Sequence, residues 1–486
     1  MSLVSSTSTW MCFDSSNQCK FNQHLSALLS EYINVINFRQ SVSLSGFALG
    51  VTLAWNSSTS DTLRNVFNAS GIEMGLVGSI VNVGACGGVL ILPCVLKSLS
   101  RTTVMVSTTP IYLVGWAFIC LADRKMWCLG MGRLLCGFSS GISCVLFPIL
   151  IGEIAGKKRR VKLLTYFQLL INCGIFYAFL VRYLIDEDNT IWKYSLISAI
   201  SCTPIVFVSI LPESPLYYLM KNDEYNAKKS IKWYHDTEKN HEELLNIINL
   251  VKYQNSKIKM MKNFHVISAI LTCHGVIIIQ QLSGINPLTF NAAIIFDNCG
   301  SGDLTSGQLT VIIAAIQIVS SLMCTVFIDR LGRRILLTLS GISMGIFLIL
   351  LGWYFSVRDN DPEFYEEIYG WMPPTWFALF FASFNLGLGP ISWSILGDTL
   401  PNEIKTLNIV SATFISWFIS FIMTLIFGKI IVAIGISYLM WIFAGVSFIG
   451  AIFFAIFIRE TDDKSLIDIQ NNFQLNPLEI GIDLNS

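Results

Sequence analysis

Charged residues are scarce in this chain of 486 residues: they make up 13% of it, whereas hydrophobic residues make up 53%. A soluble globular protein usually carries about 25% charged residues, so this chain has too few to cover a water-facing surface. The formal net charge is zero, which leaves no basic surface for nucleic acid. The thirteen cysteines form no CxxC pair and no Cys/His cluster, so neither a metal site nor a cofactor is predicted. This composition excludes a disordered chain, a secreted disulfide scaffold and an ordinary soluble enzyme, and it indicates a membrane-embedded protein.

Long apolar runs occur twelve times, each close to the ~20 residues that a helix needs to cross the hydrocarbon core of a membrane. Lipid offers backbone amides no hydrogen-bond partner, so each run is predicted to be a helix. The runs occupy residues 39–56, 74–96, 102–122, 127–151, 161–185 and 191–211 and, after a polar gap, residues 264–296, 308–328, 335–357, 374–397, 407–428 and 434–458. The predicted fold class is an all-α membrane protein with twelve transmembrane helices.

Basic residues gather after every second span, and short basic loops stay on the cytoplasmic side of a membrane. Five basic residues lie within residues 157–162, and Arg330, Arg333 and Arg334 follow the eighth run. The loop after the ninth run, residues 359–367, is acidic instead. Even-numbered spans are therefore predicted to exit into the cytoplasm, and both termini are predicted to lie there.

Two N-glycosylation sequons, at Asn56 and Asn68, fall in the first loop, which this orientation places outside. We therefore predict a glycan on each asparagine. The segment Met1–Phe38 is polar and lacks the basic-then-apolar pattern of a cleaved signal peptide. The chain is expected to be a multi-pass protein of the plasma membrane.

Charged pairs recur at the inner ends of the spans with a constant offset. Glu153 is followed seven residues later by Arg160, and Asp398 is followed seven residues later by Lys405. A distance of 245 residues separates the equivalent members of the two pairs. Such a repeat indicates two pseudo-symmetric six-helix bundles. The predicted divisions are a cytoplasmic segment 1–38, a bundle 39–211, a cytoplasmic helical linker 212–263, a bundle 264–458 and a cytoplasmic tail 459–486.

Two parallel halves are the plan of alternating-access transporters, which hold their substrate near the midplane between the halves. The inner charges can bridge the halves while the cytoplasmic side is closed, or they can merely anchor helix ends among the headgroups. The repeated spacing favours the gating role, for which the candidates are Arg101, Glu153, Arg160, Asp329, Arg333, Arg334, Asp398 and Lys405. In the linker, Tyr225, Ile231 and Tyr234 stand among Lys and Glu residues. This pattern fits an amphipathic helix that lies against the inner face, and it also fits a solvated charged loop.

Several motifs within residues 40–470 resemble those of the sugar-porter family of the major facilitator superfamily. The most specific is Gln280-Gln281-Leu282-Ser283-Gly284-Ile285-Asn286 in the seventh span. The segments Asp329–Arg334 and Pro212–Leu219 also match, and Gly389–Lys405 is most like insect facilitated trehalose transporter-like and glucose transporter-like proteins. The resemblance implies the major facilitator fold and sugar transport.

Amide side chains suit a sugar because sugar hydroxyls both donate and accept hydrogen bonds, and an indole ring can stack on the apolar sugar face. Charge is unnecessary and costly at the bilayer centre. Buried amides can instead serve only to join helices, but three of them in one family motif favour a binding role. The resemblance implies that sugar is bound by Gln168, Gln280, Gln281, Asn286, Gln317 (where many relatives have Asn), Asn385 (where some have Glu) and Trp393.

Glycine and proline follow the motif of the seventh span. Gly284 and Pro287 can loosen the outer end of this span, so that Phe290 and Asn291 swing as an outer gate. Gly284 can alternatively serve close helix packing.

Proton coupling needs a titratable group, and proton-driven relatives place an acid in the first span. Here the segment Gly46–Trp55 has no carboxylate, and Thr52 stands at the position where those relatives have the acid. The sugar gradient alone is therefore predicted to drive transport. His274 can titrate near neutral pH, or it can be a neutral histidine hydrogen-bonded within the bundle.

Three functions stay open at this point. The first is a facilitative carrier, functional as a monomer, with a hexose or a disaccharide such as trehalose as substrate. The second is a proton-coupled sugar symporter. The third is a non-transporting sugar sensor, because the loop Lys97–Thr102 keeps only Arg101 of the family pattern. An enzyme is not predicted, because the sequence has no nucleophile–base pair, metal cluster or phosphate loop.

Overall fold

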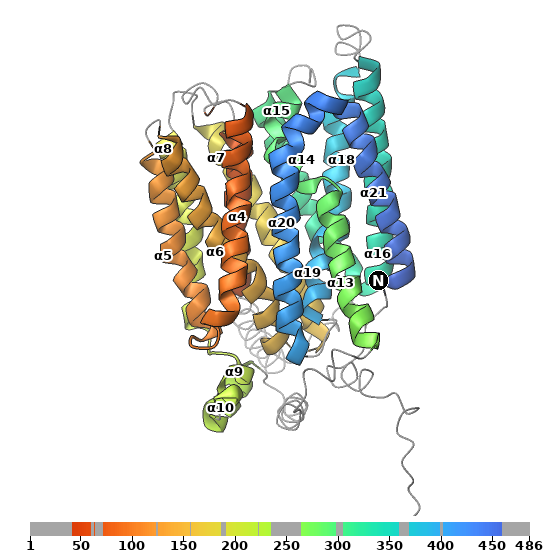
Figure 1. Cartoon of the computed structure of the whole chain (residues 1–486). Helices are drawn as coiled ribbons and strands as arrows, with labels where there is room; N and C mark the ends of the chain where they lie inside the picture. The colour runs from red at the N-terminus through yellow and green to blue at the C-terminus, as the bar shows by residue number, and fades with distance from the viewer. Residues whose placement is uncertain are drawn as a thin grey trace, which may run out of the picture.

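Helices make up the whole of the described chain outside its turns (Figure 1). The computed structural model describes residues 41–59, 63, 71–122, 125–155, 157–185, 191–221, 223–234, 264–297, 305–358, 369–398 and 402–458. The first group of elements is η1 (Ser41–Ser43), α2 (Leu44–Ser58), α4 (Gly71–Val95), α5 (Arg101–Cys120), α6 (Met126–Ile154), α7 (Lys157–Leu184), α8 (Ile191–Ala199) and η2 (Ile200–Ile210). Two short helices follow, α9 (Pro215–Met220) and α10 (Glu224–Tyr234). The second group is α13 (Phe264–Leu282), α14 (Ile285–Phe290), α15 (Ala292–Asp297), α16 (Ser306–Arg358), α18 (Met372–Leu386), α19 (Leu388–Asp398), α20 (Asn402–Ile434) and α21 (Ile436–Phe457).

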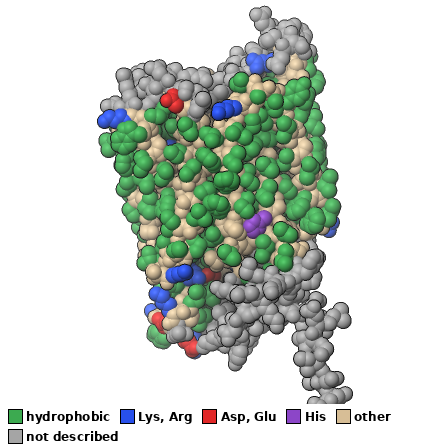
Figure 2. Space-filling model, viewed as in Figure 1, with side chains coloured by type: hydrophobic (Ala, Val, Ile, Leu, Met, Phe, Trp, Pro, Cys, Tyr) green, Lys and Arg blue, Asp and Glu red, His purple; other side chains and the backbone are tan. Residues whose placement is uncertain are grey.

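Twelve crossings of a membrane account for these elements. Ten stretches of the described chain are long and apolar enough to cross, and one of them, α16, crosses twice. A straight helix of 53 residues would be about 80 Å long against a hydrocarbon core of ~30 Å, but Gly332 has φ 76° and breaks α16. The 15-residue α2 supplies the remaining crossing. In the space-filling view, hydrophobic side chains cover the middle of the bundle and charged side chains lie near its two ends (Figure 2).

Three predicted spans are interrupted at residues that cannot continue an α-helix. Gly284, with φ 84°, separates α13 from α14, and Gly387 separates α18 from α19. The sixth span changes from α8 to the 3₁₀ helix η2, which contains Pro204. Pro204 has no backbone N–H to donate to the preceding turn, although Pro93, Pro110 and Pro148 leave α4, α5 and α6 continuous.

Small residues bring the helices of the first group into backbone contact. A Cβ atom on Gly50 of α2 would overlap the carbonyl oxygen of Ile171 in α7, and one on Gly137 of α6 would overlap the carbonyl oxygen of Val81 in α4. Dispersion contacts of this closeness stabilise membrane helices, since lipid provides no hydrophobic driving force between them. Between the groups, α4 packs on α20, and α7 packs on α16 and α19. These contacts position the polar side chains of α7 opposite those of the second group.

The helices α9 and α10 lie beyond one end of the bundle, which we call the linker end; the opposite end is the far end (Figure 1). Ile231 and Tyr234 of α10 are buried, and the Tyr234 hydroxyl donates to the Pro212 carbonyl at 2.6 Å. This part of the linker is amphipathic as predicted, but Tyr225 is 79% exposed and does not belong to its buried face. Hydrogen bonds from the side-chain and backbone amides of Asn226 lower the pKa of Asp223, which precedes α10.

Candidate functional site

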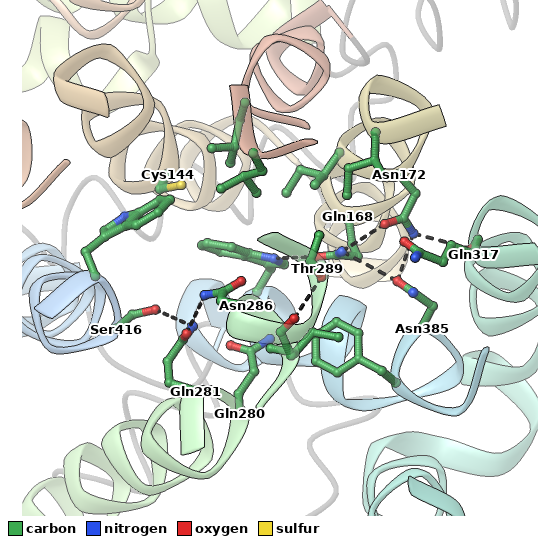
Figure 3. A pocket seen from close by; sticks show the side chains of 18 residues that line it. Cys144, Gln168, Asn172, Gln280, Gln281, Asn286, Thr289, Gln317, Asn385 and Ser416 are labelled. Carbon is green, nitrogen blue, oxygen red and sulfur yellow. Dashed lines mark hydrogen bonds between the residues drawn. The ribbon is translucent and has the colours of Figure 1, made fainter. Parts of the chain in front are cut away.

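A small cavity lies between the two groups of helices, and its polar wall is built from amides and hydroxyls (Figure 3). Its volume is about 80 Å³. Of the described residues that line it, none is charged. The polar lining residues are Gln168, Asn172, Gln280, Gln281, Asn286, Thr289, Gln317, Asn385, Trp393, Ser416 and Trp417. All seven side chains implicated by sequence therefore meet around one space; their role as sugar ligands stays a prediction.

One set of these groups belongs to the seventh and eleventh spans, and we call it the α13 amide cluster: Gln281, Asn286, Ser416 and Ser420. Gln281 Nε2 donates to Ser416 Oγ at 2.8 Å. Asn286 Nδ2 donates to Gln281 Oε1 at 2.6 Å and to Ser420 Oγ at 3.0 Å. The helix break at Gly284 lets Asn286, in the first turn of the new helix α14, turn back toward Gln281. The neighbouring Gln280 donates instead to the Leu388 carbonyl at 3.3 Å, at the break in the tenth span.

The second set faces it from the other side of the cavity, and we call it the α7 amide cluster: Gln168, Asn172, Ser321 and Asn385. Gln168 Nε2 donates to Asn172 Oδ1 at 3.2 Å, and Asn172 Nδ2 donates to Asn385 Oδ1 at 2.8 Å. Each of the three amides is less than a tenth exposed. This cluster joins α7 of the first group to α16 and α18 of the second.

Asn172 was missed by the sequence reasoning, although a signal was present. It stands four residues after Gln168, so the two side chains share one face of α7. Asn172 Nδ2 lies within hydrogen-bond distance of three acceptors, which are Asn385 Oδ1, Ser321 Oγ at 2.6 Å and the Gln317 carbonyl at 3.3 Å. A polar residue on the cavity face of a predicted span was therefore a candidate on periodicity alone.

Trp393 lies between the two clusters and is held in place from two directions. Its indole Nε1 donates to Gln168 Oε1 at 3.2 Å. Its ring meets that of Phe167 edge to face, with centroids 5.1 Å apart and an interplanar angle of 84°. A fixed indole of this kind can offer its face to the C–H surface of a sugar.

The cavity is narrow in this conformation. Its volume of about 80 Å³ is well below the roughly 300 Å³ at which ligand pockets start. The amides consequently satisfy one another across the narrow space. Admission of a ligand larger than this space requires the two groups of helices to move apart, which breaks these amide–amide bonds.

The predicted gating residues Arg101 and Glu153 form an ion pair at the linker end, at 2.8 Å, and both are largely buried. Glu153 also accepts from the Ser214 hydroxyl, and the Arg101 guanidinium lies 5.7 Å from the centre of the Tyr217 ring. Both charged residues belong to the first group of helices. The pair ties the third span to the fourth and to the start of the linker, so it does not itself bridge the halves. The gating role of both residues stays a prediction.

A different ion pair joins the halves at the linker end. Lys162 Nζ of α7 lies 2.5 Å from Asp329 Oδ2 of α16, and both side chains are nearly half exposed. Lys405 of α20 reaches the backbone of Gly152 in α6, because a Cβ on that glycine would overlap the lysine ammonium. Lys162 was counted among the basic loop residues and was not identified as a gate. Of the other candidates, Arg160 and Arg333 are buried, Arg334 is exposed, and the Asp398 side chain lies outside the described residues.

At the far end, one hydrogen bond between the halves joins Asn56 and Phe290. Asn56 Nδ2 donates to the Phe290 carbonyl at 3.2 Å, and the Phe290 side chain is fully buried. Asn291 donates to the Pro287 carbonyl at 2.8 Å within its own turn. Asn56 lies within α2 rather than in the first loop and is 9% exposed, so its prediction as an exposed glycan acceptor is wrong for this structure. Asn68 lies outside the described residues.

The Lys162–Asp329 pair offers a test of closure at the linker end. With the linker end on the cytoplasmic side, as the basic loops predict, replacing Lys162 with glutamine should raise the KM for the predicted sugar uptake about 2-fold, because an exposed ion pair contributes up to ~1 kcal/mol to the closed state. The KM for efflux should fall correspondingly. Both constants are measurable in vesicles, with Lys228→Gln on the exposed face of α10 as the control. A charge exchange, Lys162→Asp with Asp329→Lys, should restore the original constants, and its failure to do so would argue against the pair.

The fold and the cavity together define a membrane transporter rather than an enzyme: twelve crossings form two groups, with an uncharged polar cavity between them. The family model for the sugar (and other) transporters matches residues 15–473, so the chain belongs to this family. It is 29% identical over 436 residues to the facilitated trehalose transporter Tret1 of Bombyx mori. The aligned region covers 88% of this chain and 85% of that relative.

Further relatives agree with this assignment. The chain is 30% identical over 443 residues to the facilitated trehalose transporter Tret1 of Polypedilum vanderplanki, covering 88% of this chain and 86% of the relative. Among solved structures, it is similar to the major facilitator superfamily proton:xylose symporter XylE bound to 6-bromo-6-deoxy-D-glucose. That likeness has a TM-score of 0.76 at 18% identity over 90% of this chain and 99% of the other. The major facilitator fold predicted from the sequence is confirmed.

Proposed function

We propose that this protein is a facilitative sugar carrier of the plasma membrane that works by alternating access without proton coupling. Its substrate is a hexose or a disaccharide such as trehalose. The observation that carries this proposal is the cavity between the halves, whose described lining is amide, hydroxyl, indole and aliphatic, without a charged side chain. A neutral polyhydroxylated molecule is the ligand that such a lining suits.

The described first span supports the absence of proton coupling. Thr52 stands in α2 where proton-driven relatives have an acid. It is fully buried, and its hydroxyl donates a hydrogen bond to the Ala48 carbonyl at 2.9 Å. The Thr52 carbonyl accepts from Arg133 Nη1 at 2.6 Å, and the guanidinium also lies 5.1 Å from the centre of the Trp55 ring. A threonine cannot gain or lose a proton in the physiological range, so this contact offers no charge switch.

His274 does not line the cavity, and both of its ring nitrogens have hydrogen-bond partners within the second group of helices. Its Nδ1 lies 2.8 Å from the Ile270 carbonyl, and its Nε2 lies 3.0 Å from Ser411 Oγ. A neutral imidazole satisfies both contacts, with Nδ1–H donating and Nε2 accepting. This favours a structural histidine over a proton relay.

The names of the relatives support facilitated transport and a disaccharide, since Tret1 of Bombyx mori is a facilitated trehalose transporter. The Lys162–Asp329 ion pair between the halves argues against a sensor with damaged gates. We further propose that the linker end faces the cytoplasm with segments 1–38 and 459–486, and that 39–211 and 264–458 form the two halves around the linker 212–263. The carrier acts as a monomer and has no nucleic-acid partner.

Uptake of radiolabelled sugars tests the proposal. Oocytes that express the full chain should take up a hexose or trehalose saturably, to no more than the external concentration, and at the same rate with or without a pH gradient. Accumulation above the external concentration that a protonophore abolishes would establish a symporter instead. Specific sugar binding without flux would establish a sensor.

A further inference from the structure

In the α7 amide cluster, more donor–acceptor pairs lie within hydrogen-bond distance than the available hydrogens and lone pairs can satisfy at once. Asn172 Nδ2 carries two hydrogens but lies within reach of the Gln317 carbonyl, Ser321 Oγ and Asn385 Oδ1. Asn385 Oδ1 in turn lies within reach of donors on Gln168 at 3.5 Å, on Asn172 at 2.8 Å and on Ser321 at 3.4 Å. Two lone pairs cannot serve three donors equally. The network therefore has several arrangements of similar energy, and a hydroxyl can replace one member.

Asn172 is the member of this network that spans the two halves most completely. It stands on α7, whereas its three acceptors stand on α16 and α18. It also lines the cavity beside Ile171 and Ile175, which are aliphatic. On this part of the α7 wall, Asn172 and Gln168 provide the polar groups that face the cavity.

Separation of the halves to admit a sugar breaks the bonds of Asn172 to Asn385 and Ser321. Of the described α7 residues that line the cavity, Gln168 is the other polar one, and an amide left unpaired away from water is destabilising. A sugar hydroxyl that lies between Asn172 and Asn385 restores both a donor and an acceptor. A ligand without a hydroxyl at that position leaves both amides unpaired.

We propose that Asn172 is a further specificity-determining residue, which reads one particular hydroxyl of the sugar and links its binding to the contact between the halves. This inference rests on the proposed function and deepens it. A purely structural role, in which Asn172 only joins α7 to α16, predicts the same loss of stability on substitution but no dependence on which hydroxyl the ligand carries.

The test measures inhibition of uptake of the best-transported sugar by its single deoxy derivatives, in oocytes expressing the full chain. In the unsubstituted carrier, one deoxy derivative should bind about 10-fold more weakly than the parent sugar, since it leaves one amide group of the site without its hydrogen-bond partner. In Asn172→Leu, the parent sugar should weaken by about 10-fold while that derivative changes little, so their ratio approaches one. The ratios for the other deoxy derivatives should be unchanged.

Asn82→Leu is the matched control, because Asn82 is a fully buried amide of α4 that does not line the cavity. It should leave every ratio unchanged. If Asn172→Leu does not reach the surface, Asn172→Ser, which keeps a shorter polar group, should narrow the same ratio in part. Retention of all ratios in whichever Asn172 variant reaches the surface overturns the inference. Absence of any sugar uptake by the unsubstituted chain would instead refute the proposed function.

Discussion

Alanine in place of Asn286 should raise the KM for sugar uptake about 10- to 100-fold while the carrier still reaches the cell surface. Asn286 lies in the first turn of α14 and lines the cavity, where its amide bonds to Gln281 and Ser420. We propose that its Nδ2 and Oδ1 bind a sugar hydroxyl, and each hydrogen bond lost is worth about 0.5–1.5 kcal/mol. Alanine also removes the partner that orients Gln281, so a second amide loses its position.

Surface expression separates this effect from misfolding, and concentration dependence of uptake provides the KM. Gln281→Ala should act in the same direction, and the double variant should cost less than the sum of the two, because the residues contact each other. Asn408→Ala serves as the control, since Asn408 is a buried amide of α20 that does not line the cavity. Unchanged uptake kinetics in both Asn286→Ala and Gln281→Ala would exclude the α13 amide cluster as a binding site.

Alanine in place of Gly50 should destabilise the protein by ~3 kcal/mol and sharply reduce the amount that reaches the cell surface. A Cβ at this position of α2 would overlap the carbonyl oxygen of Ile171, and backbone cannot rotate away as a flexible side chain can. The two helices must separate, and α7 carries Gln168 and Asn172 into the cavity. The same methyl group on Gly445 of α21 meets nothing within 4 Å.

Gly445→Ala is therefore the matched control, and it should be neutral or slightly stabilising, because alanine has the higher helix propensity. Thermal unfolding of the detergent-solubilised protein and surface labelling measure both variants. Equal unfolding temperatures for Gly50→Ala and Gly445→Ala would contradict the close packing of α2 on α7.

Hydrophobic patterning predicted the crossings well because a membrane leaves a helix as the only way to satisfy the backbone of an apolar run. The run at 127–151 corresponds to α6, Met126–Ile154, and the run at 434–458 to α21, Ile436–Phe457. Where the boundaries differ most, at α20, the helix continues to Ile434 past the predicted end at residue 428. Helix ends near the headgroups are decided by packing and capping as much as by hydropathy.

Charged pairs were harder to predict, because sequence spacing identifies charged helix ends but not which helix each end meets. Glu153 recurs at a fixed distance from Asp398, yet its partner is Arg101 of its own half. Lys162 was a loop residue in the sequence and pairs with Asp329 across the halves. Asn56 carries a valid sequon, but the folded chain buries it against Phe290.

The sequence by itself determined that this protein lies in a membrane, how many times it crosses that membrane and which chemical types its polar groups have. These features follow from composition and hydrophobic periodicity, which are local properties. Only the tertiary structure decided which polar groups share a space. Asn172 on α7 and Asn385 on α18 are far apart along the chain, and they meet because close packing of α7 on α16 and α19 brings the two halves together. Contacts between distant segments depend on how helices pack, and the pattern within one helix does not encode its neighbours.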